Sequence, residues 1–158
     1  MKRKILPFVI ASLTVVFLLS DFGLAEEAVP PVPPNVKKMV GEAKASLKSI
    51  DMETLKAAID NKEGIPIIDV RVPKEYAEGH VPGSINIPRG LVEFFVWGKV
   101  VGYPEETDTS KKIYVYCNRG FRAVLATKSL QDLGLTNVHF VDMQLAKWIE
   151  AGYPIEKQ

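Results

Sequence analysis

The pattern that most constrains the fold is an alternation of short apolar runs with helical repeats, which begins near residue 64 and continues to the end of the chain. Four runs are rich in β-branched and aromatic residues, as strands are: residues 65–70, 84–87, 112–116 and 137–141. Helical spacing of apolar residues occupies 123–133, which Gly134 ends, and a closing helix is expected over 143–151. Strands that alternate with helices form a parallel sheet covered on both faces. We therefore expect an α/β protein of three layers.

Two further helices are predicted ahead of the first strand. In residues 35–50, apolar side chains recur every three or four positions through to Leu47 and Ile50, which indicates one amphipathic N-terminal helix. Asp51 is a typical N-cap for a second helix over 52–60. The predicted organisation is thus a helix over 35–50 followed by the main domain over 51–158.

The first 25 residues have the pattern of a secretory signal peptide. Three basic residues at positions 2–4 precede an apolar run over 5–19, and small residues occupy the −3 and −1 positions of a cleavage site after Ala25. The alternative is an uncleaved membrane anchor, which would be the only source of membrane contact. Residues 26–34 contain the sequence VPPVPP, which predicts an extended proline-rich tether. We expect the protein to be periplasmic or otherwise exported.

Composition excludes several classes of function. The 158 residues include 20 basic and 19 acidic side chains, so no positive excess supports nucleic-acid binding. Cys117 is the only cysteine and there are two histidines, which rules out a disulfide framework, a Cys-x-x-Cys pair and a multi-cysteine metal site. Neither a metal nor a cofactor is expected.

Cys117 directly follows the predicted strand over 112–116 and precedes a predicted helix. In a parallel α/β sheet this position is the carboxyl edge, where ligands bind. A turn into a helix N-terminus directs backbone N–H groups toward an anion, and the positive charge of Arg119 and Arg122 favours the thiolate. We interpret Cys117 as a reactive nucleophile; the alternative is a small buried apolar residue.

Three segments resemble the rhodanese family. The sequence DVRVPKEYAEGHVPGSINIP at 69–88 is similar to the family signature, YCNRGFRA at 116–123 is similar to its active-site loop, and GYP at 152–154 is similar to its usual ending. The resemblance implies a rhodanese-like three-layer fold around a five-stranded parallel sheet. It also implies a sulfurtransferase, which moves a sulfane sulfur from thiosulfate or a persulfide donor to cyanide or a thiol.

The resemblance implies a role for each residue of the loop. Cys117 would be the catalytic nucleophile and would carry the sulfur as a persulfide. The donor would be bound by the residues that follow it, which are Asn118, Arg119, Gly120, Phe121 and Arg122. Its partners would be a small anionic sulfur donor and a thiol or cyanide acceptor, with a protein acceptor as a further possibility.

A second group of residues is predicted to be structural. It consists of Asp69, Arg71, Glu75 and His80, and Glu75 lies one helical turn beyond Arg71, within reach of an ion pair. One departure from the family concerns the start of the closing helix, where Met143 and Gln144 replace the usual glycines.

Two alternatives to the enzyme stay open. The domain could be a non-enzymatic persulfide carrier or a module that binds a partner. It could also be a phosphatase or arsenate reductase of the same fold, but those enzymes need Cys-x5-Arg and this chain has Cys-x4-Arg from Cys117 to Arg122. Residues 89–110 form a long connection rich in aromatic side chains, which is either core or a flap; we expect it to shape access to Cys117.

Overall fold

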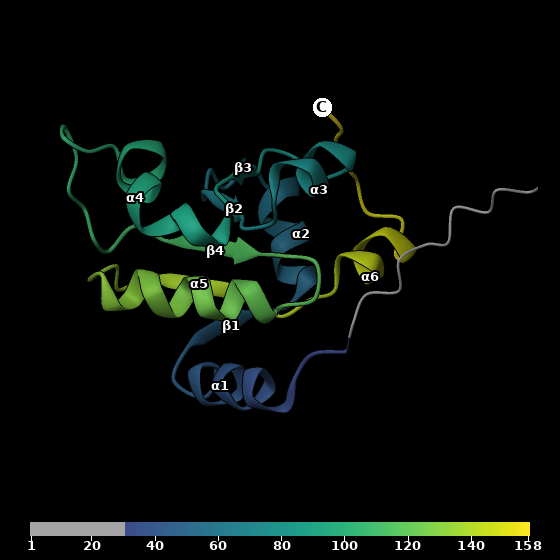
Figure 1. Ribbon diagram of the computed structural model, residues 1–158. Coiled ribbons are helices and arrows are strands. Elements are labelled where there is room, and N and C mark those ends of the chain that lie inside the picture. The colour runs from purple at the N-terminus through teal and green to yellow at the C-terminus, as the bar shows by residue number, and fades with distance from the viewer. Residues whose placement is uncertain (1–30) are drawn as a thin grey trace, which may run out of the picture. The chain divides into compact units, whose positions relative to one another are not determined.

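The computed structural model describes residues 31–158 (Figure 1). The predicted signal peptide, its cleavage site and most of the proline-rich tether lie outside the described residues. Within 31–158, none of the helices has both the length and the apolar character needed to cross a membrane.

A five-stranded sheet forms the centre of the domain, and every pairing in it is parallel. The strand order is β1-β5-β4-β2-β3. The strands are β1 (Lys48–Ile50), β2 (Ile67–Asp69), β3 (Ile85–Asn86), β4 (Ile113–Tyr116) and β5 (Val138–Val141). The α/β class and the five-stranded parallel sheet are therefore confirmed, and β4 lies at the centre.

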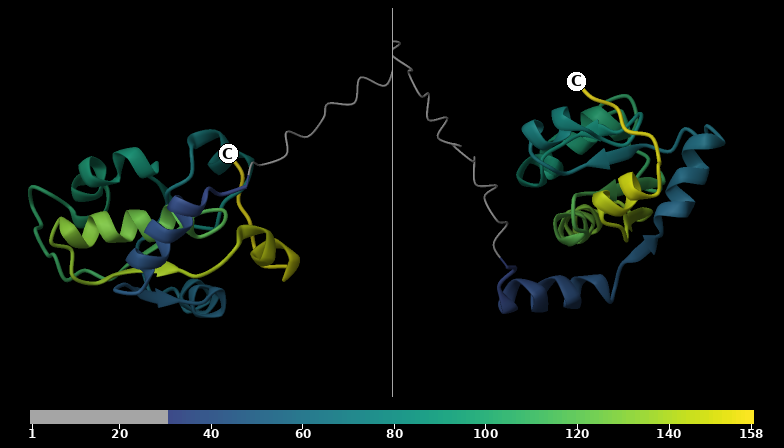
Figure 2. Two further views of the ribbon diagram at one scale, coloured as in Figure 1. Left: turned by 60° about the horizontal axis from the view of Figure 1, so that its bottom comes forward. Right: turned by 90° about the vertical axis from the view of Figure 1, so that its right-hand side faces the viewer.

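Helices cover both faces of the sheet (Figures 1 and 2). One face carries α1 (Pro34–Lys44), α4 (Val92–Val96) and α5 (Phe121–Asp132), whose buried residues share one apolar cluster. The other face carries α2 (Met52–Asp60) and α6 (Leu145–Glu150), which contribute to a second cluster. A short helix, α3 (Pro73–Glu78), follows β2. The three layers expected from the alternation of strands and helices are present.

The residues of β4 show how the sheet separates the two clusters. Ile113 and Val115 belong to the cluster under α5, whereas Tyr114 and Tyr116 belong to the cluster under α2 and α6. This division follows from the alternation of side chains along a strand. Because all four residues are buried, β4 is apolar throughout, as a central parallel strand should be.

The N-terminal helix is shorter than the sequence predicted. It ends at Lys44, and residues 48–50 form β1, which pairs with β5 in the register Lys48 to His139. The prediction of one helix over 35–50 is wrong, because the last two apolar side chains of this range pack on opposite faces of the sheet and not on one face of a helix. Leu47 packs against the cluster under α5, and Ile50 packs against the other cluster. The second helix is confirmed at α2, where the Asp51 carboxylate accepts a hydrogen bond of 2.8 Å from the Thr54 N–H.

The aromatic-rich connection is helical in its first part. This first part consists of a 3₁₀ turn at Arg89–Leu91, then α4, then a π-helical turn, η2 (Trp97–Val101). Its valines are buried in the cluster under α5, whereas Phe94, Phe95 and Tyr103 are exposed. One side of this segment is therefore ordinary core.

Candidate functional site

Cys117 is the first residue after β4, at the carboxyl edge of the sheet. Its side chain is buried, with 2% of its surface exposed, and it belongs to the cluster under α5. The residues that follow, Asn118 and Arg119, are exposed. Cys117 is therefore the buried base of the loop, and the exposed residues that follow it form the rim.

Backbone hydrogen bonds hold the loop at both ends. The Leu145 N–H, at the start of α6, donates to the Asn118 carbonyl at 2.9 Å, and the Val124 N–H donates to the Gly120 carbonyl at 3.0 Å. Gly120 has a φ of 82°, a left-handed conformation that glycine adopts without strain. The N–H groups of the first turn of α5 precede Val124, and a helix start leaves such groups for a ligand.

Arg122, in the first turn of α5, is paired with Glu75 of α3. Its Nη1 and Nη2 atoms donate to the two carboxylate oxygens of Glu75 at 2.6 and 2.8 Å. The hydrogen bonds from Arg122 lower the pKa of Glu75, assisted by a further bond of 3.2 Å from the Val72 N–H, while burial opposes them. The pairing of Glu75 with Arg71 that its spacing suggested is replaced by this one, because α3 carries Glu75 toward α5.

Asp69 and Arg71 form a buried ion pair at the end of β2, beside β4. Arg71 donates from Nε and Nη2 to Asp69 Oδ2 at 2.9 and 2.7 Å, and its Nη2 also donates to the Gly79 carbonyl at 2.7 Å. The guanidinium lies 5.9 Å from the ring centre of Tyr116, the residue before Cys117. These contacts fix the turn that lies next to the cysteine.

Tyr116 and His80 anchor the segment after α3. The Tyr116 hydroxyl accepts from the Val81 N–H at 3.0 Å and lies 3.2 Å from Ser84 Oγ, and burial raises its pKa. The His80 ring stacks on Tyr76 at 3.7 Å, and its Nδ1 is 2.8 Å from the Tyr76 carbonyl. His80 therefore has the contacts of a buried structural residue.

Arg119 forms no ion pair with this network in the described residues 31–158. It lies between two surface hollows, one of which is about 420 Å³ and includes Met143, Gln144 and Lys147 in its wall. Gln144 has a φ of −108° and a ψ of 131°, an extended backbone that needs no glycine, and Met143 packs in the cluster under α6. The departure from the family glycines thus leaves the backbone unstrained at Gln144.

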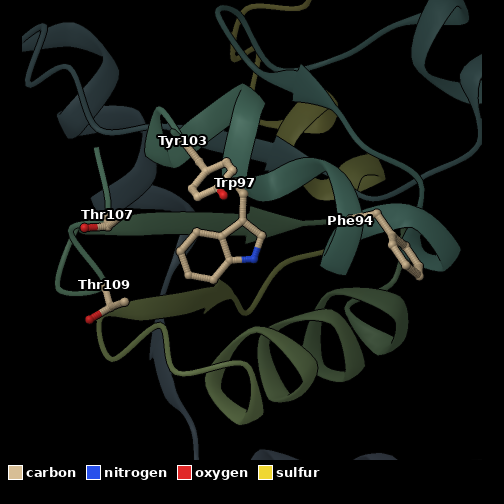
Figure 3. Close-up of a pocket in the computed structure, with 5 residues that line it drawn as sticks. All are labelled: Phe94, Trp97, Tyr103, Thr107 and Thr109. Carbon is tan, nitrogen blue, oxygen red and sulfur yellow. The ribbon is translucent and has the colours of Figure 1, made fainter. Parts of the chain in front are cut away.

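The aromatic pocket of the 89–110 connection lies beside α4 and η2, and Figure 3 shows its lining residues spread along the sheet, from Thr107 and Thr109 to Phe94. Its volume is about 500 Å³, and it is lined by Phe94, Trp97, Tyr103, Thr107 and Thr109. The Thr109 carbonyl accepts from the Thr136 N–H at 2.8 Å, just ahead of β5, so the Thr109 end of the pocket is beside the amino ends of β4 and β5. The connection begins at the carboxyl edge, where the Arg89 N–H donates to the Val70 carbonyl at 3.1 Å, so the expectation that it shapes access to Cys117 stays a prediction for its first residues and not for Thr107 and Thr109.

One residue beside the loop escaped the sequence prediction. Lys37 of α1 lines a hollow together with Arg119 and Gly120. Periodicity placed it on the polar face of a helix, and only the packing of α1 against α5 brings it to the loop. No group of His, Cys, Asp and Glu that could hold a metal ion occurs within residues 31–158.

Known proteins resemble the chain in both sequence and structure. Residues 51–151 match the rhodanese-like domain. The putative sulfur carrier protein YrkF of Bacillus subtilis is 30% identical over 107 residues, which are 68% of this chain and 54% of that protein. The thiosulfate sulfurtransferase PspE of Escherichia coli is 41% identical over 71 residues, which are 45% of this chain and 62% of that protein. The matches thus span between 54% and 62% of the length of these two relatives.

A solved structure extends the comparison to the whole domain. It is a protein of unknown function from Rhodopseudomonas palustris, described as a possible tyrosine phosphatase. At 30% identity it superposes with a TM-score of 0.66 and covers 81% of this chain and 99% of its own.

Proposed function

The chain belongs to the rhodanese-like family, and from this premise we propose that it is a sulfurtransferase that works through a persulfide on Cys117. The observation that carries the proposal is the position of this thiol at the base of the loop between β4 and α5. The two relatives described above are named as a sulfur carrier and a thiosulfate sulfurtransferase, which supports sulfur transfer as the class of reaction.

The proposed reaction has two steps. The Cys117 thiolate attacks the outer sulfur of thiosulfate, the S–S bond of the donor breaks, and sulfite leaves with the bonding electrons. The acceptor, cyanide or a thiolate, then attacks the outer sulfur of the persulfide and returns Cys117 as a thiolate. Covalent catalysis of this kind divides one transfer into two easier steps.

The residues around Cys117 have distinct roles in this proposal. Backbone N–H groups from residues 118–122 bind the donor dianion and later the charged persulfide, because the α5 N-terminus favours negative charge in both states. Arg119 adds an exposed positive charge at the rim. Arg122, Asp69 and Arg71 hold the loop and its neighbours in place through the ion pairs described above.

Intact-mass measurement after treatment with thiosulfate, without reductant, tests the proposal. The wild type should gain one sulfur atom, about 32 Da by elementary composition, and cyanide should remove it. Cys117→Ser should gain none while keeping its circular dichroism spectrum, since the hydroxyl is nearly isosteric but far less nucleophilic. A wild type that gains no sulfur would overturn the assignment. Sulfur gain without turnover to cyanide or thiols would instead identify a carrier.

A phosphatase assay on the wild type and on Cys117→Ser tests the phosphatase alternative. A phosphatase of this fold would need the arginine of the loop on the phosphoryl group, whereas both nitrogens of the Arg122 fork are bound to Glu75. We therefore expect no hydrolysis of p-nitrophenyl phosphate above that of Cys117→Ser. Robust hydrolysis without a sulfur adduct would favour the phosphatase.

A further inference from the structure

A hollow of about 210 Å³ lies between α1 and the start of α5, which we call the α1–α5 hollow. Four residues of α1 line it, at positions i, i+3, i+4 and i+7, and so form one face of the helix. The opposite wall includes Arg119 and Gly120 of the loop and Phe121 of α5. The α1 residues are Lys37, Val40, Gly41 and Lys44. The hollow therefore borders the loop that follows Cys117, at Arg119 and Gly120.

The charges in the wall are mainly positive. Lys37, Lys44 and Arg119 face one acidic residue, Asp142, and Asp142 is already bound to Lys44 at 2.8 Å. Within residues 31–158, neither Lys37 nor Arg119 forms an ion pair. Two cations without an ion pair in one small hollow favour an anionic ligand, and Arg119 also lines the neighbouring hollow, where the acidic residues are Asp51, Glu53 and Asp142.

Gly41 leaves the α1 wall of the hollow without a side chain at that position. It lies inside α1, where glycine costs about 1 kcal/mol relative to alanine. No heavy atom lies within 4 Å of the position that a Cβ would take, so no packing contact requires a glycine there. A larger side chain at this position would extend into open space and narrow the hollow.

We propose that the α1–α5 hollow binds the anionic end of the acceptor, which is a small thiol bearing carboxylates. This inference rests on the proposed function, because it supposes a persulfide on Cys117. The backbone of the loop suffices for a donor as small as thiosulfate, whereas the second step brings a larger molecule to the same sulfur. α1 lies ahead of residues 51–151, the part that matches the family model, so the subsite combines a helix outside that match with the loop inside it.

In the proposed step, Lys37 and Arg119 hold the carboxylates of the acceptor. The acceptor thiolate attacks the outer sulfur of the Cys117 persulfide, a new S–S bond forms on the acceptor, and the bond to Cys117 breaks with its electron pair returning to the cysteine. No oxidant or reductant is consumed.

Steady-state transfer to two thiols tests this inference: mercaptosuccinate, with two carboxylates, and 2-mercaptoethanol, with none. Lys37→Glu and Gly41→Glu each add a negative charge to the hollow, so each should raise the KM for mercaptosuccinate by about tenfold and leave the KM for 2-mercaptoethanol unchanged. Lys38→Glu is the matched control, since it makes the same charge change on the same helix but lies outside the hollow. Gly41→Ala controls for helix stability. Equal KM values for Lys37→Glu and Lys38→Glu would overturn the inference.

A binding measurement separates the inference from the proposed function. Methylthiosuccinate, which cannot accept sulfur, should shift the backbone amide signals of Gly41 and Gly120 in NMR spectra of the wild type, and Lys37→Glu should weaken its binding. Absence of such shifts would overturn the subsite even if persulfide forms. Persistent shifts in a protein that gains no sulfur would support an anion site while overturning the sulfurtransferase assignment.

Discussion

Glu75 and Arg122, which are 47 residues apart in the sequence, join α3 to the first turn of α5 through hydrogen bonds of 2.6 and 2.8 Å. The two side chains are partly exposed, with 29% and 36% of their surfaces accessible. The pair therefore holds the helix that follows Cys117 and at the same time compensates the charge of Arg122.

Neutralising Arg122 and neutralising Glu75 should have opposite effects on the KM for the donor. Arg122→Gln should raise the KM for thiosulfate more than it lowers kcat, because it removes positive charge near the loop. Glu75→Gln should lower that KM, because the arginine then keeps its full charge. Both variants should lose about 1 kcal/mol of unfolding free energy, the scale of a partly exposed ion pair. If both variants raise the KM equally, the pair acts on the loop only through structure.

The free energy of unfolding should decrease as the pH is lowered through the range where Glu75 takes up a proton. Its pKa is lowered in the folded protein, chiefly by the hydrogen bonds from Arg122. The unfolded state therefore binds protons first, so this contribution is complete above the unfolded pKa of about 4.3 and disappears as the pH falls through the lower, folded pKa. Urea unfolding between pH 6 and 3 should show a smaller decline for Glu75→Gln than for the wild type. An identical decline would contradict the prediction.

Asp69→Asn should destabilise the protein far more than any change at Glu75. The substitution leaves Arg71 buried beside Tyr116 with no carboxylate to balance its charge, at a cost on the order of 3 kcal/mol. Chemical denaturation of the purified variant measures the loss. Lys56 and Asp60, an ion pair on the surface of α2, offer a control, and Asp60→Asn should change the unfolding free energy by less than about 1 kcal/mol.

Trp97→Ala should lower the melting temperature and leave sulfur transfer unchanged. Trp97 packs against the cluster under α5, so its loss should cost about 2 kcal/mol, below the value for a fully buried tryptophan. It lines a pocket with Thr109, which lies beside the amino end of β5, whereas Cys117 follows the carboxyl end of β4. Phe94→Ala is the control from the same pocket, since Phe94 is 77% exposed and should matter little to stability. A change in either kinetic constant for Trp97→Ala would show that this segment does reach the site.

Export is tested at the amino terminus. We propose that the signal peptide is removed after Ala25, so the mature chain should begin at Glu26. Mass spectrometry of protein purified from the periplasm of a bacterial host should find this terminus. An intact Met1 terminus in the membrane fraction would instead support an anchor.

The fold could be predicted from the sequence wherever local patterns and burial agree. β4 is apolar at every position and both of its faces are covered, and Asp51 caps α2 through a contact only three residues away. β1 could not be predicted in the same way. Lys48 and Ser49 are exposed and carry no strand signal, and only pairing with β5 makes them a strand.

In the candidate site, too, the features set by local sequence were predictable and those set by tertiary packing were not. The order of strand, cysteine, glycine and helix around Cys117 is local, and it was sufficient to predict a loop at the sheet edge. The partner of Arg122 was not predictable, because Glu75 reaches it only when the fold brings α3 near the first turn of α5. Lys37 was missed for the same reason, since its position beside Arg119 depends on how α1 packs against α5.

The shortness of the two edge strands bears on how the protein behaves at high concentration. β3 has two residues and β1 has three, and in β1 the first two side chains, Lys48 and Ser49, are exposed and polar. Unpaired backbone groups along a sheet edge are templates on which a second chain can add a strand, and short, charged edges prevent this. Each side of the sheet therefore ends before it could support the growth of an intermolecular sheet, which favours a chain that remains monodisperse while it folds.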